Sequence, residues 1–272
     1  MTETKAMFLF ALFSLVFSAT LFVVGILDAF SGAALGYVIG GIFFPWAAIR
    51  IQHVWKGLSP AERTQDYSFS EVRRFFMVSA IFTSTAIIPH YLMVLWGADI
   101  KLITIVNWLS HVLLTLQIIL GARMVVSLYN HRWVSSVTVG LAFLGILSLL
   151  VNVMFPDVFV HIQGSRYPLL QPSQQFSFFQ QALIFFGITL PSINLLIQAI
   201  RVRAETRVKR TAALLGGGFL LGVLTAVVID YGTGLFAAVA VTILVTLYPF
   251  TVSLAGIRMA KEREERNRNI SS

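Results

Sequence analysis

Long uninterrupted apolar runs recur along this chain of 272 residues, and they limit its fold more than any other feature. An apolar helix of about 20 residues is long enough to cross a bilayer. The runs do not alternate between polar and apolar residues, so they predict an all-α polytopic membrane bundle rather than strands. Eight runs predict eight transmembrane helices: Met7–Leu27, Ala33–Ile51, Phe75–Trp96, Leu102–Leu128, Trp133–Phe155, Phe176–Ile200, Thr211–Ile229 and Leu235–Ile257.

The composition supports lipid as the main solvent of the chain. Hydrophobic residues make up 57% of it and charged residues only 12%, whereas soluble domains contain about 25% charged residues. The first run, at about 21 residues, exceeds the 7–15 residues of a signal peptide's apolar region. It therefore predicts an uncleaved span. We expect an integral membrane protein, in a bacterial-type cytoplasmic membrane.

The positions of the basic residues predict the orientation. If both termini face the cytoplasm, 18 of the 20 Lys and Arg residues lie on that side, and only Lys101 and Arg166 lie outside. Cytoplasmic loops of membrane proteins carry this excess of positive charge. The basic residues thus predict an N-in, C-in topology, with the lipid bilayer as partner and no nucleic acid. The sequence also allows a membrane or cytoplasmic protein as a partner.

A domain division follows from the same patterns. Residues 1–260 are predicted to form a single transmembrane helical domain, and residues 261–272 a charged cytoplasmic tail. The tail alternates basic and acidic residues, which is typical of a solvated helix extension.

Two histidines, His90 and His111, lie at equal distances from a predicted turn between adjacent spans. Equal distances from a short turn predict equal depth in the membrane, because both helices rise 1.5 Å per residue. Asn107 lies one helical turn from His111, on the same face. We expect His90, Asn107 and His111 to face a shared cavity in the outer half of the membrane. The pair is suited to haem, a metal or a proton relay, and the alternative is an ordinary interhelical hydrogen bond.

A second group of polar side chains lies mainly in the sixth predicted span. These side chains are expected to line a polar cavity, with interhelical hydrogen bonding as the alternative for each of them. The group consists of Gln180, Gln181, Asn194 and Gln198, with Gln117 and Asn152 from neighbouring spans. Of these, Gln181, Asn194 and Gln198 join the histidines and Asn107 as candidate ligand-binding residues.

Two further features bear on packing and chemistry. Gly218 and Gly222 form a small-residue face, which is typical of close helix packing. The aspartates Asp28, Asp99, Asp157 and Asp230 fall at outer ends or turns of the predicted spans, so no buried carboxylate is expected. Cysteine is absent, which excludes disulfides and thiolate sites.

The sequence contains no catalytic motif, and it specifies neither a cofactor nor an enzyme activity. Spans interrupted by proline favour a small-molecule permease whose site lies between helices. One alternative is the membrane subunit of a redox complex, with haem or quinone contacted through His90 and His111. The other is a membrane ligand sensor that signals to a separate partner.

Overall fold

The computed structural model describes residues 5–7, 9–13, 16, 29–96, 100–160, 169–201, 206–231 and 234–271, some of them by their backbone alone. This described part is all-α, with nine α-helices, one 3-10 turn, one π-helical segment and two short strands. The elements are α2 (Ala29–Gly57), α3 (Pro60–Gln65), α4 (Tyr67–Trp96), α5 (Ile100–Tyr129), η1 (His131–Trp133), α6 (Val134–Met154), β1 (Val158–Val160), β2 (Leu169–Gln171), α7 (Gln174–Ile184), η2 (Phe185–Thr189), α8 (Leu190–Arg201), α9 (Thr206–Tyr231) and α10 (Gly234–Ser271).

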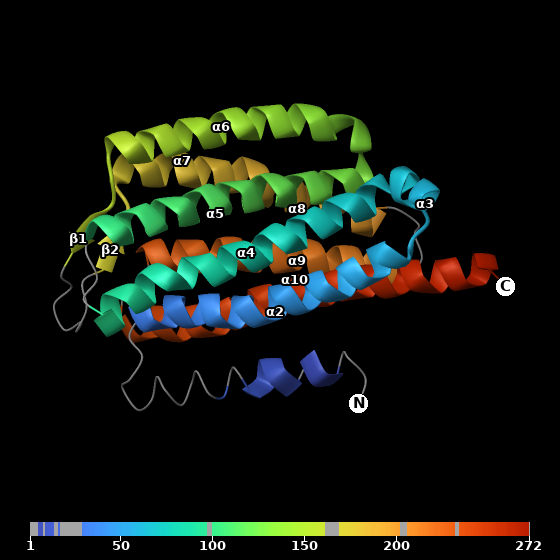
Figure 1. The fold of residues 1–272 in the computed structure, drawn as a ribbon, viewed down its shortest axis with the longest axis horizontal. Helices are drawn as coiled ribbons and strands as arrows, with labels where there is room; N and C mark the ends of the chain where they lie inside the picture. Colours follow the sequence, from blue (N-terminus) through green and yellow to red (C-terminus); the bar gives the residue numbers. More distant parts are fainter. Residues whose placement is uncertain are drawn as a thin grey trace.

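The long helices run alternately in opposite directions along the bundle (Figure 1). α2 packs between α10 and α4, α4 packs on α5, and α9 packs on α10 and α8. α6 lies at the edge, against α5 and α7. α3 and the C-terminal turns of α10 mark one end of the bundle, the charged end, and the antiparallel strands β1 and β2 mark the other, the ribbon end.

Five helical segments in the described part are long and apolar enough to cross a membrane, and they indicate an integral membrane protein. They overlap the last five predicted spans, and the last segment begins and ends later than its predicted span. Their bounds are Lys101–Tyr129, His131–Met154, Gln174–Arg201, Val208–Val228 and Ile243–Arg268.

The structure therefore supports five spans among the described residues, not the eight that the sequence predicts. The first predicted span, Met7–Leu27, lies largely outside the described residues. The predicted spans Ala33–Ile51 and Phe75–Trp96 are helical within α2 and α4. However, the described parts of α2 and α4 contain helical turns with polar and charged side chains, such as Arg50 and Glu71. These side chains lower the mean hydropathy of the described part of each helix.

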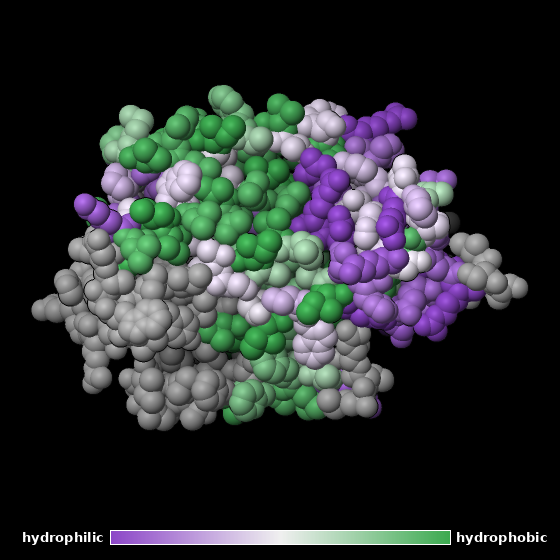
Figure 2. Space-filling view, viewed as in Figure 1, coloured by the Kyte–Doolittle hydropathy of each residue, from purple (hydrophilic) through white to green (hydrophobic). Residues whose placement is uncertain are grey.

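The exposed face of α6 shows why lipid, not water, surrounds these helices. Val139, Phe143, Ile146 and Leu150 form a stripe at helical spacing, and each of these side chains is between 56% and 71% exposed. A soluble monomer rarely shows so continuous an apolar stripe. Figure 2 shows hydrophobic side chains spread over the length of the bundle, with hydrophilic side chains gathered at the charged end.

Aromatic rings fill the centre of the bundle. Phe44, Phe75, Phe76 and Phe219 are each at most 2% exposed. The Phe75 and Phe219 rings pack edge to face, with centroids 5.3 Å apart, which is a favourable aromatic geometry. These rings come from α2, α4 and α9, so they join helices that are distant in the sequence.

Ion pairs hold the charged end together. Arg50 of α2 pairs with Glu264 of α10 at 2.5 Å, and Asp66 pairs with Arg263 of α10 at 3.0 Å. The last turns of α10, which belong to the predicted tail, thus contact α2 and the start of α4. The division into a domain and a tail stays a prediction.

A short helix, α3, caps this end. The Ser59 side chain accepts from the backbone N–H of Glu62, and the Ser59 backbone N–H donates to the Glu62 carboxylate at 2.8 Å. This is a capping box. The bond from the Ser59 backbone is the main reason why the pKa of Glu62 lies below its ordinary value.

A buried carboxylate lies beside the charged end, contrary to the expectation from sequence. Glu71 of α4 is fully buried, and its two oxygens accept from Arg123 Nε at 2.7 Å and Arg123 Nη2 at 2.8 Å. Arg74 adds a third contact at 2.8 Å. The bidentate pair joins α4 to α5, and it satisfies a charge that would be costly to bury alone.

A π-helical segment, η2, interrupts the helix that α7 and α8 form together. It ends just before Pro191, which has no N–H to donate into the preceding turn. A π-segment adds a residue to its turn, so it rotates the helix beyond it relative to the helix before it. The sixth predicted span is thus one helix with two differently rotated halves.

Candidate functional site

A cavity of about 330 Å³ lies in the ribbon half of the bundle. We call it the histidine cavity, because His111 lines it. Its walls come from α4, α5, α7, η2, α9 and α10, and apolar side chains predominate, among them Phe75, Phe82, Leu114 and Phe219. Binding cavities for small molecules have this mixture of apolar walls and few polar groups.

The polar side chains of the histidine cavity come mainly from one face of α5. Asn107, Ser110, His111 and Gln117 all line it. Asn107 lies three residues before Ser110 and four before His111, and Gln117 lies seven after Ser110, spacings that keep them along one helical stripe. Gln117 also donates to Ser79 Oγ at 3.0 Å, which fixes the side chain in a buried position. Gln180 of α7 adds a polar group from another wall.

Asp157, which follows α6, lies against this stripe with only 6% of its side chain exposed. Its Oδ2 accepts from Asn107 Nδ2 at 2.5 Å and lies 2.8 Å from His111 Nε2. Its Oδ1 accepts from Asn152 Nδ2 of α6 at 2.9 Å. The carboxylate therefore joins α5 to α6. The expectation that no carboxylate would be buried is wrong for Asp157.

The contact between His111 and Asp157 orients the imidazole ring. When the ring carries its hydrogen on Nε2, this N–H donates to the carboxylate of Asp157. Asn107 Nδ2 lies 3.1 Å from the same ring nitrogen. The ring also packs edge to face on Phe176, with centroids 4.6 Å apart. These contacts fix the imidazole at the cavity wall.

A shallower groove adjoins the carboxylate on its other side. It has a volume of about 270 Å³ and is lined by Trp108 of α5, Asn152 of α6 and Asp157 after α6, among others. Asn107 lines both this groove and the histidine cavity. The hydrogen-bonded cluster around Asp157 thus stands between the two spaces.

The predicted pairing of His90 with His111 stays a prediction. The backbone of His90 belongs to α4, but its side chain lies outside the described residues. Asn107 and His111 are in direct contact, as their spacing predicts. No group of three or more His, Cys, Asp or Glu side chains that could hold a metal occurs among the residues described.

The other three candidate residues do not line the histidine cavity. Gln181, Asn194 and Gln198 are partly buried and are absent from its walls, where Gln180 lies instead. Neighbouring helical residues point about 100° apart, and η2 rotates α8 relative to α7. A ligand-binding role for these three residues therefore stays a prediction.

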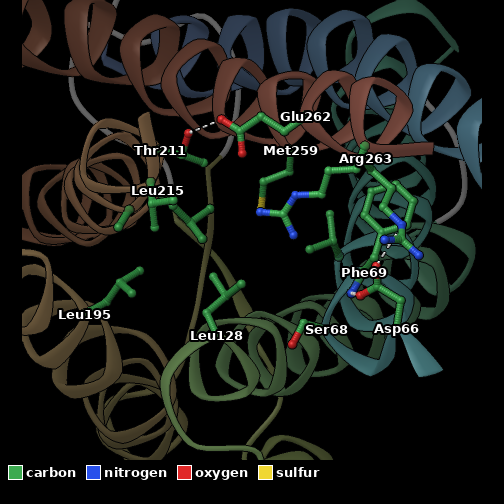
Figure 3. Close-up of a pocket in the computed structure, with 14 residues that line it drawn as sticks. Asp66, Ser68, Phe69, Leu128, Leu195, Thr211, Leu215, Met259, Glu262 and Arg263 are labelled. Atoms are coloured by element: carbon green, nitrogen blue, oxygen red, sulfur yellow. Dashed lines mark hydrogen bonds and ion pairs between the residues drawn. The ribbon is translucent and has the colours of Figure 1, made fainter. Parts of the chain in front are cut away.

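A second cavity, of about 250 Å³, opens at the charged end (Figure 3). We call it the charged-end cavity. Leu128, Leu195 and Leu215 form apolar walls, while Glu262 and Arg263 of α10 lie along one side. Thr211 Oγ1 donates to Glu262 at 3.5 Å. The sequence analysis missed this cavity, because its residues come from four separate helices and the start of α4.

The chain matches no protein-family model, and no curated protein is significantly similar to it.

Proposed function

We propose that the protein is a small-molecule permease, and that it binds an uncharged, largely apolar molecule in the histidine cavity. The observation that carries this proposal is the cavity itself, about 330 Å³ of space between apolar helices with a polar stripe on α5. A molecule that fills it would bury its apolar part against Phe82 and Leu114 and form hydrogen bonds with Asn107, Ser110 or Gln117. The cavity volume falls within the range of small-molecule sites.

The interruption by η2 of the helix that α7 and α8 form supports the proposal, because transport requires helices that can change conformation. Ile184 precedes η2 and Ile188 lies within it, and both line the histidine cavity. Transporters commonly build their sites from discontinuous helices, because a broken helix can bend where an intact one resists. π-segments occur frequently at functional sites.

We further propose that the charged end faces the cytoplasm. The described basic side chains of α2, α4 and α10 gather there, and positive charge is retained on the cytoplasmic side of membrane proteins. A bacterial-type cytoplasmic membrane is the host membrane that we propose. The histidine cavity then lies in the outer half of the bilayer.

No specific observation favours the redox alternative, because His111 Nε2 already contacts Asp157 and Asn107. The sensor alternative makes a different prediction from the permease, since a sensor binds its ligand without carrying it across. The experiment below separates the two.

The first step of the test is a binding measurement. Purified protein in detergent is heated with a panel of small uncharged aromatic alcohols and amides, and the unfolding temperature is measured. A compound that binds the folded state raises that temperature. We expect Ser110→Leu, which fills the histidine cavity, to abolish the increase. Ser136→Leu, on the exposed face of α6, should leave it unchanged.

The second step is uptake of the best binder into proteoliposomes. We expect uptake above that of protein-free liposomes, and its loss in Ser110→Leu but not in Ser136→Leu. Binding without uptake contradicts the permease and supports the sensor. If no compound of the panel binds and none is taken up, this result contradicts a small-molecule site of this class.

A further inference from the structure

The same helices line both cavities. α4, α5, α9 and α10 contribute to the histidine cavity and to the charged-end cavity. The interrupted helix formed by α7, η2 and α8 also lines both. Ile184 and Ile188 line the histidine cavity, and Leu195, further along the same helix, lines the charged-end cavity. The two spaces thus follow one another along the inside of a single set of helices.

One continuous face of α9 passes through both cavities. Val208, Ala212 and Leu215 line the charged-end cavity, and Phe219 and Val223 continue the stripe into the histidine cavity. Their spacings of three and four residues keep them on one side of the helix. α4 repeats the pattern with Phe69, Val72, Phe75, Phe82 and Ala86.

The barrier between the cavities is thin at α4 and α9. Val72 lines the charged-end cavity and Phe75 the histidine cavity, about 4.5 Å apart along the axis of α4. On α9 the corresponding residues are Leu215 and Phe219, about 6 Å apart along the axis. At these two helices, about one helical turn of side chains therefore separates the two spaces.

Two aromatic rings form the centre of that barrier. Phe75 is fully buried and Phe219 is 2% exposed, and the two rings meet edge to face at 5.3 Å. α5 presents Gly121 to them, and a Cβ placed there would lie 3.4 Å from Phe75 and 3.6 Å from Phe219. The same Cβ would lie 3.0 Å from Ile188 Cδ1, so the two rings and the Ile188 side chain meet against the backbone of α5 at this level.

We infer that the charged-end cavity is the second half of one permeation pathway, and that Phe75 and Phe219 close this pathway between its halves. The inference rests on the proposed permease function and extends it. In the structure the rings are in contact, so the path is closed at this level.

The lining indicates the class of molecule that passes. The described walls of the histidine cavity contain no Asp, Glu, Lys or Arg, so a permanent charge would lack a partner there. At the charged end, Asp66 and Glu262 face Arg263 and Arg266 around the second cavity, so neither sign of charge predominates. The pathway is suited to small neutral molecules that have one or two hydrogen-bonding groups.

Access of a thiol reagent tests the pathway directly, because the natural chain contains no cysteine. Ser110→Cys places one thiol in the histidine cavity, and Thr211→Cys places one in the charged-end cavity. A neutral sugar-linked methanethiosulfonate that does not cross lipid is added to vesicles from the charged-end side. We expect Thr211→Cys to react readily and Ser110→Cys to react slowly.

The same labelling is then repeated after the rings are removed. In the Phe75→Ala/Phe219→Ala background, we expect Ser110→Cys to react about tenfold faster or more, which corresponds to a barrier lower by about 1.4 kcal/mol. The matched control is Phe43→Ala. Phe43 of α2 is equally buried and lines neither cavity, and its ring packs on Phe250 of α10, so its removal should leave the rate of Ser110→Cys within about twofold.

Gel filtration and thermal unfolding establish that each variant is folded. If the double alanine variant does not fold, Phe75→Leu and Phe219→Leu replace it, with a smaller increase in rate expected. An unchanged rate in folded ring variants overturns the inference, as does an equal increase in Phe43→Ala. If access opens but no compound of the panel is taken up, the permease function fails while the connected pathway stands.

Discussion

Three side chains converge on the carboxylate of Asp157, and this makes one residue responsible for joining two helices. Asn107 and His111 reach it from α5, and Asn152 reaches it from α6. Few other described contacts between these helices are polar, and α6 otherwise lies at the edge of the bundle. The position of α6 therefore depends on this carboxylate.

We expect Asp157→Asn to destabilise the protein by about 1–3 kcal/mol. The new NH2 group, itself a donor, would replace one accepting oxygen and face a donor of Asn107, His111 or Asn152. The measurement is the unfolding temperature of the purified protein in detergent. Val158→Ala is the control, since this neighbour is 55% exposed and should have little effect. An unchanged unfolding temperature in Asp157→Asn would show that the three contacts do not stabilise the bundle.

The buried ion pair between Glu71 and Arg123 leads to a second prediction for a single residue. We expect Glu71→Ala to cost about 3–5 kcal/mol of folding free energy, because Arg123 would lose its bidentate partner in a largely buried position. Lys261→Ala is the control, since Lys261 is 71% exposed and Glu265 lies 3.9 Å away on the same helix. Such a surface pair contributes well under about 1 kcal/mol. Similar losses in both variants would contradict the assigned role of Glu71.

At the scale of the helices, α9 and α10 pack closely at two glycines. A Cβ at Gly218 would lie 2.7 Å from Val252 Cγ2 and 3.2 Å from Val252 N, and one at Gly222 would lie 2.9 Å from the Tyr248 ring. The close packing predicted for this small-residue face is confirmed. Backbone atoms of α10 cannot move aside as a flexible side chain can, so the space is fixed.

Gly218→Ala should therefore destabilise the protein, by about 1–3 kcal/mol as is typical of overpacking. Gly217 is the ideal control, because a Cβ there meets nothing within 4 Å. Gly217→Ala should be neutral, or stabilising by up to about 1 kcal/mol, because alanine restricts the unfolded chain. Thermal unfolding of both variants is the measurement. Equal stability of the two variants would contradict the close approach of α9 and α10.

Hydropathy predicts where these helices lie, but not how they are rotated. The apolar runs from Leu102 onward correspond to helices, because lipid forces the backbone to satisfy its own hydrogen bonds. Rotation depends on packing, and a single residue changes the direction of a side chain by about 100°. This is why Gln180, and not Gln181, lines the histidine cavity.

Contacts between distant segments were likewise beyond a reading of the sequence alone. Asp157 lies 46 residues from His111 in the chain, and its position after α6 marks it only as a turn residue. The polar stripe of α5 was partly predictable, because Asn107, His111 and Gln117 recur at helical spacing. The charged-end cavity was not predictable. Its walls come from several helices, and the spacing of residues within one helix does not show which other helices lie beside it.

For the whole molecule, the gathering of basic side chains at one end predicts its orientation. A reporter that functions only in the cytoplasm should be active when inserted within residues 58–66 or fused after residue 270. The same reporter should be inactive when inserted within residues 161–168, between the two strands. The reason is the positive charge retained on the cytoplasmic side. Activity at both ends of the bundle, or at neither, would contradict the orientation.

The packing of α2 against α10 has a consequence for biosynthesis. Arg50 and Glu264, which join these helices, are 214 residues apart. At a synthesis rate of about 5–20 residues per second, α2 is made about 10–40 seconds before its partner. During that interval the face of α2 that α10 later covers, including Phe43 with its ring against Phe250, must be shielded by lipid or by the insertion machinery. The bundle therefore closes only when its last helix has left the ribosome.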